Sequence, residues 1–410
     1  MIVHGLMITE IARGVNGTCS SLMNWHNAGM QIEIITQLNE VPAAAWNALV
    51  QDNNPFVRHE FLSALETHGC VGKKFGWLPC HILVYDAGEL IGAMPLYEKY
   101  NSYGEFVFDH AWAEAYKRYG LRYFPKLVSS VPYSPVSGQR LLAKTGMEKA
   151  VFPRLVHAAC ELAKTKQASG VHWLFANEQD WLETQNLVTR HDCQYHWRNF
   201  HYQHFDAFLE TLQPKKRKNI KQERRKVKES GVTLRCLNGH TACDQDWARF
   251  AFFYQHTFES KWGIPTLNEG FFKAVAKALP EQVLLVMADK DNECIAGSLM
   301  YISNTRLYGR HWGCVEYIDS LHFEACYYQG IEYCIEHQLT LFEPGAQGEH
   351  KVARGFIPTL TRSSHYLVEA GFRPAIKQHA QFERRAVADY MQELKTHLPY
   401  RQGFLDAFKG

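Results

Sequence analysis

Apolar residues along this chain follow two spacings, and segments with one spacing alternate with segments of the other. Apolar residues three and four positions apart indicate helices, whereas short apolar runs bounded by turn residues indicate strands. The first spacing predicts helices at 46–50, 60–67, 147–166, 247–258, 271–279 and 321–337, and a final helix carrying Val387, Tyr390, Met391, Leu394 and Leu398. The second predicts strands at 32–35, 171–175, 283–288, 295–303, 306–312, 339–342 and 381–384, and a hairpin at 83–92. This alternation is typical of an α/β protein.

One combination of helix and hairpin occurs twice. The first copy reads Leu83-Val-Tyr-Asp-Ala-Gly-Glu-Leu-Ile-Gly92 and then Tyr103-Gly104; the second reads Leu285-Val-Met-Ala-Asp-Lys-Asp-Asn-Glu-Cys-Ile-Ala-Gly297 and then Tyr308-Gly309. In both copies the second glycine follows the first by 12 residues, and upstream Pro55 to Phe61 and Pro265 to Phe271 are each 6 residues. These offsets predict a tandem duplication of an α/β unit of about 170 residues, giving two similar domains with a cleft between them.

The length of the chain agrees with a duplication, because 410 residues exceed what a single hydrophobic core usually supports. We predict a first domain at 30–205, a second domain with the active site at 206–385, and a C-terminal helix and tail at 386–410. Residues 1–29 are rich in Gly, Asn and Ser and lack a sustained period. We therefore expect them to be a disordered extension, with either Met1 or Met30 as the start.

Composition narrows the class of protein. The net charge is only +2, from 44 basic and 42 acidic residues, so any attraction to nucleic acid or to an anionic membrane must be local. The sequence contains no apolar run of about 18 residues and no signal peptide at its start. The 11 cysteines have irregular spacings that fit neither a disulfide framework nor paired zinc ligands. These features are typical of a cytoplasmic protein with reduced thiols.

The strongest local charge lies between the two predicted domains. The segment Pro214-Lys-Lys-Arg-Lys-Asn-Ile-Lys-Gln-Glu-Arg-Arg-Lys-Val-Lys228 holds nine basic residues and one acidic residue, with Ile220 and Val227 one heptad apart. This pattern predicts a helix with a cationic face and a narrow apolar seam. Such a helix is either a solvated surface or a site for phosphate on a nucleotide, a lipid pyrophosphate or tRNA. The candidate contacts are Lys215, Lys216, Arg217 and Lys218.

The densest polar cluster is Leu341-Phe-Glu-Pro-Gly-Ala-Gln-Gly-Glu-His-Lys-Val-Ala-Arg-Gly355, which follows a predicted strand. Pro344, Gly345 and Gly348 permit sharp turns and open backbone amides, and loops at strand ends often carry active sites. The segment offers a base, amide donors and fixed positive charge through Glu343, Gln347, Glu349, His350, Lys351 and Arg354. Its spacing fits neither a P-loop nor the HExxH motif of a zinc protease.

A second polar cluster is Tyr308-Gly-Arg-His-Trp-Gly313, followed by His322, Glu324 and Tyr328. Glu324 and Tyr328 are four residues apart and share one face of the predicted helix. A metal site formed by His311, His322 and His350 is conceivable, but their spacing matches no known ligand pattern, so we expect no metal. The sequence lacks a G-x-S-x-G motif, so a serine hydrolase has no support.

Five segments are long enough to compare with known families: Asn54-Pro-Phe-Val-Arg-His-Glu-Phe-Leu-Ser-Ala-Leu-Glu66, Ser102-Tyr-Gly-Glu-Phe-Val-Phe-Asp-His-Ala-Trp112, Tyr308-Gly-Arg-His-Trp-Gly313, His322-Phe-Glu-Ala-Cys-Tyr-Tyr-Gln329 and Glu343-Pro-Gly-Ala-Gln-Gly-Glu-His-Lys351. They resemble segments of the bacterial FemAB-like family of peptidoglycan biosynthesis or recognition proteins, over the chain from about residue 31 to the end. That family resembles the Fem aminoacyltransferases. The resemblance implies two tandem GNAT-like domains, each a mixed, mainly antiparallel sheet flanked by helices.

The resemblance also implies transfer of an acyl or aminoacyl group to an amine of a cell-wall precursor or related metabolite. This reaction needs a base for the ammonium, donors for the oxyanion and an acid for the leaving group. The candidate bases are Glu343, Glu349 and His350, and the candidate acids are Tyr308 and Tyr328. The candidate substrate contacts are Gly345, Gln347, Gly348, Lys351, Arg354, Arg310, His311, Trp312, His322, Glu324, Tyr103 and Asp109. Of these, the amides near Gly345–Gly348 and Lys351 are expected to hold the oxyanion or a substrate carboxylate.

Two departures from the family pattern concern the acyl donor. The Q/R-x-x-G-x-G/A loop that binds the pyrophosphate of acyl-CoA is missing from both halves, and so is the long coiled-coil arm of some Fem enzymes. We expect no tightly bound cofactor, and the donor is either acyl-CoA or an aminoacyl-tRNA bound by 215–228. Two alternatives compete with the transferase: a non-catalytic protein that recognises a muropeptide or nucleotide sugar, and, with less support, a tRNA-binding protein.

Overall fold

The computed structural model describes residues 25–27, 29–260, 263–346 and 348–408. Most of the predicted disordered extension, residues 1–24 and 28, lies outside the described residues. The strands are β1 (Trp25–Asn27), β2 (Met30–Ile35), β3 (Trp77–Pro79), β4 (His81–Asp86), β5 (Glu89–Met94), β6 (Tyr97–Lys99), β7 (Lys126–Ser129), β8 (Leu142–Ala143), β9 (Gly170–Trp173), β10 (Val188–Arg198), β11 (Thr233–Leu237), β12 (Val283–Lys290), β13 (Glu293–Ile302), β14 (Arg306–Cys314), β15 (Leu341–Glu343) and β16 (Ile357–Leu367).

The α-helices are α1 (Ala43–Asn47), α2 (His59–Thr67), α3 (His110–Arg118), α4 (Glu148–Thr165), α5 (Gln179–Glu183), α6 (Phe205–Glu210), α7 (Pro214–Glu229), α8 (Asp244–Glu259), α9 (Glu269–Ala278), α10 (Leu321–Phe323), α11 (Gln329–Glu336) and α12 (Arg373–Thr396). A π-helical turn, η4 (Glu324–Tyr328), joins α10 to α11. The 3₁₀ segments are η1 (Leu38–Glu40), η2 (Pro55–Val57), η3 (Pro280–Gln282), η5 (Glu349–Arg354), η6 (Ala370–Phe372) and η7 (Leu405–Phe408). Within the described residues, no helix has the length and apolar character needed to cross a membrane.

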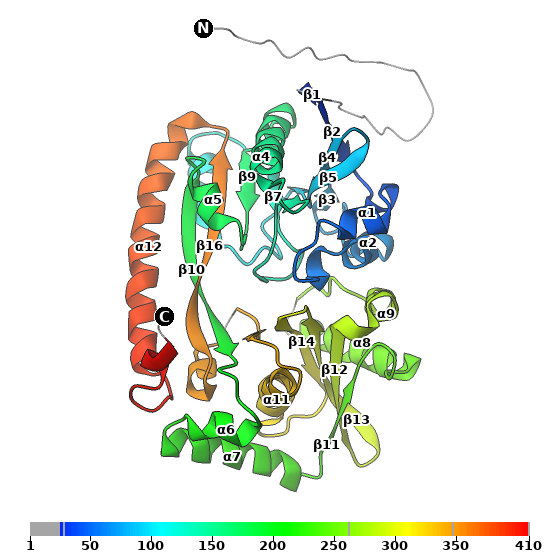
Figure 1. The fold of residues 1–410 in the computed structure, drawn as a ribbon, viewed down its shortest axis with the longest axis vertical. Helices are drawn as coiled ribbons and strands as arrows, with labels where there is room; N and C mark the ends of the chain where they lie inside the picture. The colour runs from blue at the N-terminus through cyan, green and yellow to red at the C-terminus, as the bar shows by residue number, and fades with distance from the viewer. Residues whose placement is uncertain (1–24, 28, 261–262, 347, 409–410) are drawn as a thin grey trace.

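The strands form two sheets, which Figure 1 shows distributed over an upper and a lower half. One sheet has the order β1-β2-β4-β5-β8, and the other has the order β11-β12-β13-β14-β15-β10-β16-β9-β7-β6-β3. Only β7–β9 and β14–β15 are parallel among the strand pairs of the described residues. Both sheets are therefore mainly antiparallel, as the sequence predicts.

The two halves repeat one topology. The hairpin β4–β5 corresponds to β12–β13, helix α4 corresponds to the run α10–η4–α11, and the parallel pair β7–β9 corresponds to β14–β15. Phe61 and Phe271 occupy the third position of α2 and of α9, as the matched spacing predicts. The Tyr-Gly match is wrong, however. Gly104 lies in a turn with φ +79°, whereas Gly309 lies inside strand β14, because the first half inserts residues 100–125 between β6 and β7.

Two long strands hold the halves together. In Figure 1, β10 and β16 run side by side from the upper half into the lower half, and α12 packs along them. These two strands and α3 have no counterpart in the sequence prediction. The strand predicted at 381–384 is wrong because these residues belong to α12, which begins beside Pro374 and continues through 24 residues. The predicted domain border at 385 falls inside the same helix.

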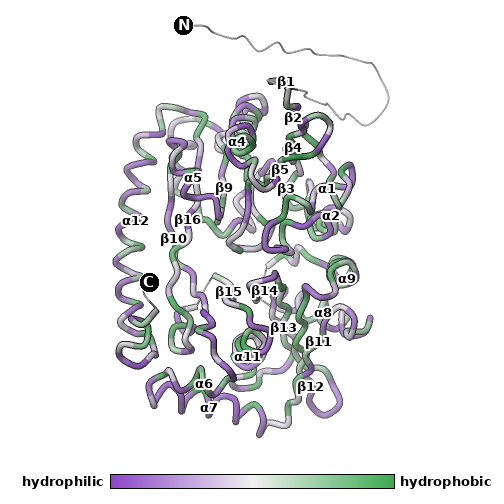
Figure 2. The backbone as a smooth tube through the Cα atoms, viewed as in Figure 1, coloured by the Kyte–Doolittle hydropathy of each residue, from purple (hydrophilic) through white to green (hydrophobic). Residues whose placement is uncertain are grey.

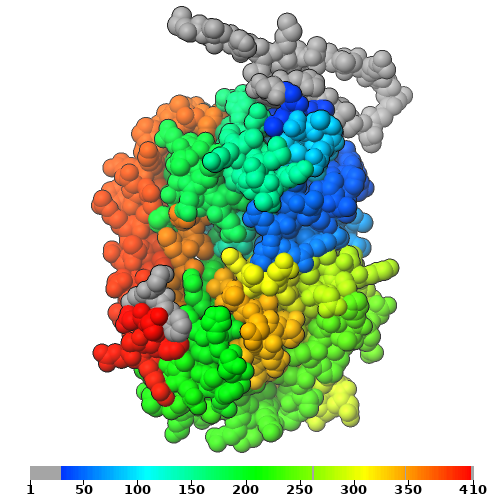
Figure 3. Space-filling view, in the orientation of Figure 1, coloured from blue at the N-terminus to red at the C-terminus, as the bar shows by residue number. Residues whose placement is uncertain are grey.

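The halves also share a hydrophobic core, and Figure 3 shows their surfaces in direct contact. The rings of Phe61 and Phe271 meet at a centroid distance of 5.3 Å, and Phe56 packs on Tyr301 and Tyr308 at 5.2 Å. Around this contact, Asp52 accepts hydrogen bonds from the Asn304 amide at 3.0 Å and the Ser303 hydroxyl at 2.7 Å. Along α2 and α9 the halves are therefore packed together, and no cleft separates them there.

Candidate functional site

Strands β14 and β15 diverge after a short parallel contact. Residues Arg306–Tyr308 pair with Leu341–Glu343, and beyond them β14 continues to Cys314 with β13 as its strand partner. The register against β13 shifts at Arg310, because Leu299 faces His311 while Met300 faces Gly309. An extra residue of this kind bends a strand and leaves backbone groups outside the ladder. The chain that follows β15 folds back beside this divergence as η5.

Lys351 lies in this region and is almost fully buried. Its side chain belongs to a residue that is 3% exposed, and its Nζ donates a hydrogen bond to the Gly345 carbonyl at 2.8 Å. Burial, reinforced by the positive charge of Arg310, lowers the pKa of Lys351 to about 7. A lysine near neutrality can change its protonation state within the pH range in which enzymes operate.

His350 is next to Lys351 and is more exposed. Its Nε2 shares a hydrogen bond of 2.9 Å with the Tyr327 hydroxyl, and its ring lies 5.5 Å from Phe323 and 6.4 Å from His322. Partial burial and the charges of Arg354 and Lys351 lower the pKa of His350 below 6.5. The imidazole is therefore neutral at pH 7, the state that a general base requires.

Residues from the two polar clusters of the sequence thus meet in one place. Trp312 of β14 packs on His322 at 5.4 Å, and His322 packs on Tyr327 at 5.3 Å. Tyr327 belongs to the π-helical turn η4, and such turns are frequent at functional sites. We refer to Arg310, Trp312, His322, Phe323, Tyr327, His350, Lys351 and Arg354 as the β14–η5 cluster.

Arg354 and Tyr328 connect this cluster to the basic helix α7. The Arg354 guanidinium stacks on Phe323, with its carbon 3.5 Å from the ring centroid, and forms an ion pair of 2.6 Å with Glu223. The Tyr328 hydroxyl donates a hydrogen bond to the same Glu223. Glu324 accepts hydrogen bonds from Arg224 at 3.0 and 3.1 Å, so it and Tyr328 both face α7, as their shared helix face predicts.

Glu343 occupies a different environment, at the junction of the two halves. It is 1% exposed and accepts hydrogen bonds from Arg306 at 3.2 Å and from the Ser137 amide at 3.3 Å. The Arg310 guanidinium is 3.8 Å from it and the His196 Nε2 is 4.0 Å from it. A carboxylate enclosed by two guanidinium groups and an amide of the other half favours a role in joining the halves.

Glu349 points toward α12. Its carboxylate accepts a hydrogen bond of 2.6 Å from Tyr390, whose hydroxyl is 2.8 Å from that of Tyr195 on β10. Glu343 and Glu349 therefore contact different elements, and the structure offers them as structural carboxylates more readily than as a pair of bases. Gln347 lies outside the described residues. Gly345 and Gly348 have φ values of +100° and +108°, which only glycine adopts without strain.

Four other candidates lie away from the β14–η5 cluster. Tyr308 is 1% exposed in the core against Phe56, and burial raises its pKa, which makes it a poor acid for a leaving group. His311 is buried against Tyr254 at 5.2 Å, and burial lowers its pKa to about 3. Asp109 forms a buried ion pair with Lys126, and the Tyr103 hydroxyl donates to the Ile264 carbonyl at 3.2 Å.

Metal binding gains no support from the histidines considered above, because His311 is separated from His322 and His350 by its packing on α8 and α9. Among the described residues, no group of three or more His, Cys, Asp and Glu side chains has the arrangement of a metal site. Every cysteine in the described part of the chain is a free thiol.

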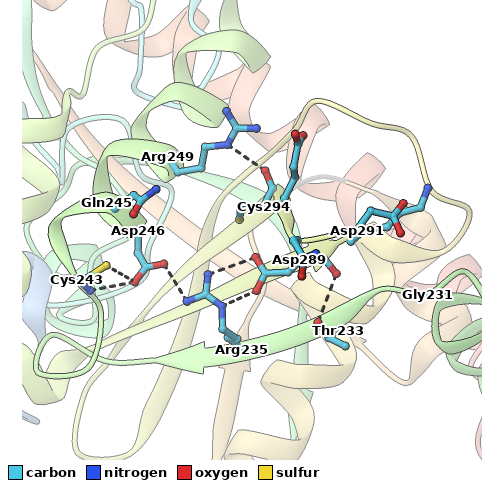
Figure 4. Close-up of a pocket in the computed structure, with 13 residues that line it drawn as sticks. Gly231, Thr233, Arg235, Cys243, Gln245, Asp246, Arg249, Asp289, Asp291 and Cys294 are labelled. Carbon is cyan, nitrogen blue, oxygen red and sulfur yellow. Dashed lines mark hydrogen bonds and ion pairs between the residues drawn. The ribbon is translucent and has the colours of Figure 1, made fainter.

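The most open hollow of the second half lies elsewhere, between β11, the β12–β13 hairpin and the start of α8 (Figure 4). It has a volume of about 960 Å³. Its central side chain, Arg235, is engaged by Asp289 at 2.5 Å and by Asp246 at 2.9 Å, so these charges neutralise one another. Because its carboxylates are already paired and its lining shares no residue with the β14–η5 cluster, we assign the chemistry to the cluster.

The basic helix α7 covers residues 214–229, with Ile220 and Val227 buried as the heptad spacing predicts. Figure 2 shows α7 as a mainly hydrophilic stretch at one end of the molecule. Basic residues of its middle and last turns form ion pairs: Lys221 with Asp206, Arg224 with Glu324 and Glu332, and Lys226 with Asp319. Among the described residues, no ion pair involves Lys215, Lys216, Arg217 or Lys218 of the first turns.

Several residues of the site escape sequence reasoning. Glu223 had a visible signal, because it is the only acidic residue between 214 and 228. Tyr327 stands between two residues that the sequence analysis singles out, but nothing local distinguishes it from them. His196, Arg306 and Ser137 reach Glu343 from three different elements, so only tertiary structure brings them together.

Comparison with known proteins identifies the family. Residues 37–402 match the FemAB-like family, described as peptidoglycan biosynthesis/recognition. The chain belongs to this family, which confirms the resemblance of the five segments. No curated protein matches the chain.

Solved structures are similar to the chain in fold. FemX is 12% identical, with a TM-score of 0.51, and the match covers 82% of this chain and 98% of that chain. A tandem GNAT protein from the clavulanic acid biosynthesis pathway is 10% identical over 82% of this chain and 98% of that chain, with a TM-score of 0.42. L-PGS from Bacillus licheniformis is 10% identical over 78% and 95%, with a TM-score of 0.46. The chain therefore has the predicted fold of two tandem GNAT-like domains.

Proposed function

We propose that this member of the FemAB-like family is an N-acyltransferase that acylates an amine of a peptidoglycan precursor or related metabolite. The observation that carries the proposal is the pairing of His350 with Lys351 where β14 and β15 diverge. One group is neutral at pH 7 and the other titrates near pH 7, because both are partly or wholly removed from water next to other positive charges.

The reaction needs no further side chain for its proton transfers. His350 takes a proton from the acceptor ammonium, and the free amine nitrogen attacks the carbonyl carbon of the donor. A C–N bond forms, the negative charge moves to the carbonyl oxygen, and protonated Lys351 together with backbone amides beside Arg310 stabilises that oxyanion. When the intermediate collapses, the bond to the leaving oxygen or sulfur breaks, and the imidazolium returns its proton to that atom.

The donor that fits best is an aminoacyl-tRNA bound through its phosphates. Lys215–Lys218 place four positive charges on the first turns of α7, where the helix dipole is also positive. This arrangement is unfavourable for the isolated helix and favourable for a bound polyanion. The missing Q/R-x-x-G-x-G/A loop leaves acyl-CoA without its usual pyrophosphate site.

The proposal is tested by incubating the protein with UDP-linked muropeptide and with either aminoacyl-tRNA or a set of acyl-CoAs. We expect the mass of the muropeptide to increase by one acyl group only with a donor, and the Lys351→Met variant to abolish the increase. Muropeptide binding without acylation by any donor would instead support the recognition protein.

A second measurement separates the donors. Changing Lys215, Lys216, Arg217 and Lys218 together to Ala should weaken tRNA binding and flatten its dependence on salt concentration, because each lost phosphate contact removes about one unit of the slope. An unchanged slope would remove α7 from the donor site. The matched control changes Lys221 and Lys226, which are already paired with Asp206 and Asp319.

A further inference from the structure

Glu223 is the one acidic residue among the basic residues of α7, and it is committed to the β14–η5 cluster. Its Oε1 accepts a hydrogen bond from Arg354 Nη2 at 2.6 Å, and its Oε2 accepts one from Arg354 Nε at 3.2 Å. Two parallel bonds of this kind fix the plane of a guanidinium as well as its position. The Tyr328 hydroxyl donates to the same carboxylate and holds it from the other side.

Arg354 transmits this constraint to His350. Its Nη1 donates a hydrogen bond of 2.8 Å to the His350 carbonyl, while its guanidinium lies 3.5 Å from the centre of the Phe323 ring. The arginine is thus held by the carboxylate at one edge, by an aromatic face, and by the backbone of the histidine. Its side chain is 10% exposed, so little of this contact is screened by water.

His350 has few other restraints on its position. It is the second residue of η5, which follows Gly348 with φ +108°, a backbone conformation that a chain does not hold by itself without supporting contacts. The contacts that support it are the Tyr327 hydroxyl at Nε2 and the Arg354 side chain at the carbonyl. A displacement of about 1 Å in a group that transfers protons lowers the rate strongly.

We propose that Glu223 is a positioning residue for His350, acting through Arg354, so that the helix carrying the basic patch also sets the geometry of the base. This inference rests on the proposed function for the role of His350, and adds that α7 and the reaction centre form one mechanically connected unit. Occupation of α7 by a donor can then be felt at η5 without a separate allosteric element.

The charges around His350 give the inference a direct signature. From its own segment Arg354 and Lys351 face the imidazole, from α7 Glu223 faces it, and from α10 and η4 it meets His322, Phe323 and Tyr327. The two arginine and lysine charges disfavour the imidazolium, whereas the Glu223 carboxylate favours it. Neutralising Glu223 should therefore lower the pKa of His350, and removing the Arg354 charge should raise it.

The experiment is an NMR titration of the His350 ring in the full chain, with the signal assigned by its loss in His350→Gln. We expect Glu223→Gln to lower this pKa and Arg354→Met to raise it, each by about half a unit. Glu229→Gln on the same helix is the matched control, because Glu229 pairs with exposed Arg225 at 3.6 Å and should leave the titration unchanged. Shifts in the same direction for the two variants, or no shift, would overturn the inference.

Kinetics provide a second readout. With a working donor, Glu223→Gln should lower kcat about tenfold with little change in KM, and should move the acidic limb of the pH profile with the measured pKa. Glu223→Asp, which keeps the charge, should recover most of the activity. A loss shared equally by both variants would mean that Glu223 acts only as a structural contact. If no donor supports turnover, the proposed function fails, while the titration still decides the coupling.

Discussion

The two halves place ionisable residues at corresponding parallel strand pairs, but in opposite states. In the second half, Lys351 and His350 lie where β14 and β15 diverge, and their pKa values are lowered. In the first half, Lys126 at the start of β7 is fully buried and forms ion pairs with Glu105 at 2.8 Å and with Asp109. Buried charges that are mutually paired stabilise one arrangement, whereas a titratable group near neutrality is available for proton transfer.

The insertion between β6 and β7 explains the difference. Residues 100–125 have only residues 303–305 as their counterpart in the second half, and they bring Ser102, Glu105, Asp109 and Tyr123 onto Lys126. The first half also divides the counterpart of β14 into β7 and β8, and the residues between these strands reach Glu343 through the Ser137 amide. One half therefore supports the junction, and the other keeps its site open for chemistry.

The largest expected effect comes from the base. His350→Gln should lower kcat/KM by about 10²- to 10⁴-fold, because it removes the group that accepts the ammonium proton, and should leave the free energy of unfolding nearly unchanged. Acyl transfer and urea unfolding measure the two effects. His337→Gln, an exposed histidine on α11, is the control and should keep full activity. A full rate in His350→Gln would place the base elsewhere.

The corresponding change in the first half should affect stability instead. Lys126→Met leaves Glu105 and Asp109 buried without their cation and should lower the free energy of unfolding by about 3–5 kcal/mol. Lys144→Met removes an exposed pair with Glu89 and should cost roughly 0–1 kcal/mol. Urea denaturation compares the two. If the folded fraction of Lys126→Met lost its activity while remaining stable, the division of roles between the halves would be wrong.

The smallest expected effect is a change in the pH profile. Activity should fall below pH 6.5 as His350 takes up a proton, and above about pH 7 as Lys351 loses the proton that stabilises the oxyanion. Lys351→Arg keeps a permanent charge, so it should remove the alkaline limb and leave the acidic limb in place. The limbs are measured as kcat/KM against pH. They must stay at the same pH when the acceptor amine is replaced by one of different pKa.

Local sequence patterns predicted the elements that depend on nearby residues. The 18 residues of α4, the basic helix α7 and the hairpins β4–β5 and β12–β13 appear where the spacing of apolar residues places them. The strand expected at 381–384 failed because residues on both sides continue a helix whose apolar face packs on β10. Propensity in a short window is overruled by such packing.

The sequence by itself determined the duplication, the family, and the segment that carries His350 and Lys351, because each is written in residues that lie close together along the chain. Only the tertiary structure decided which of the candidate residues meet. Strands β10 and β16 pair Val188 with His365, and Glu223 reaches Arg354 across 131 positions, so no local pattern encodes either contact. The lowered pKa of Lys351 has the same origin, since burial and a neighbouring arginine exist only once the two polar clusters have folded against each other.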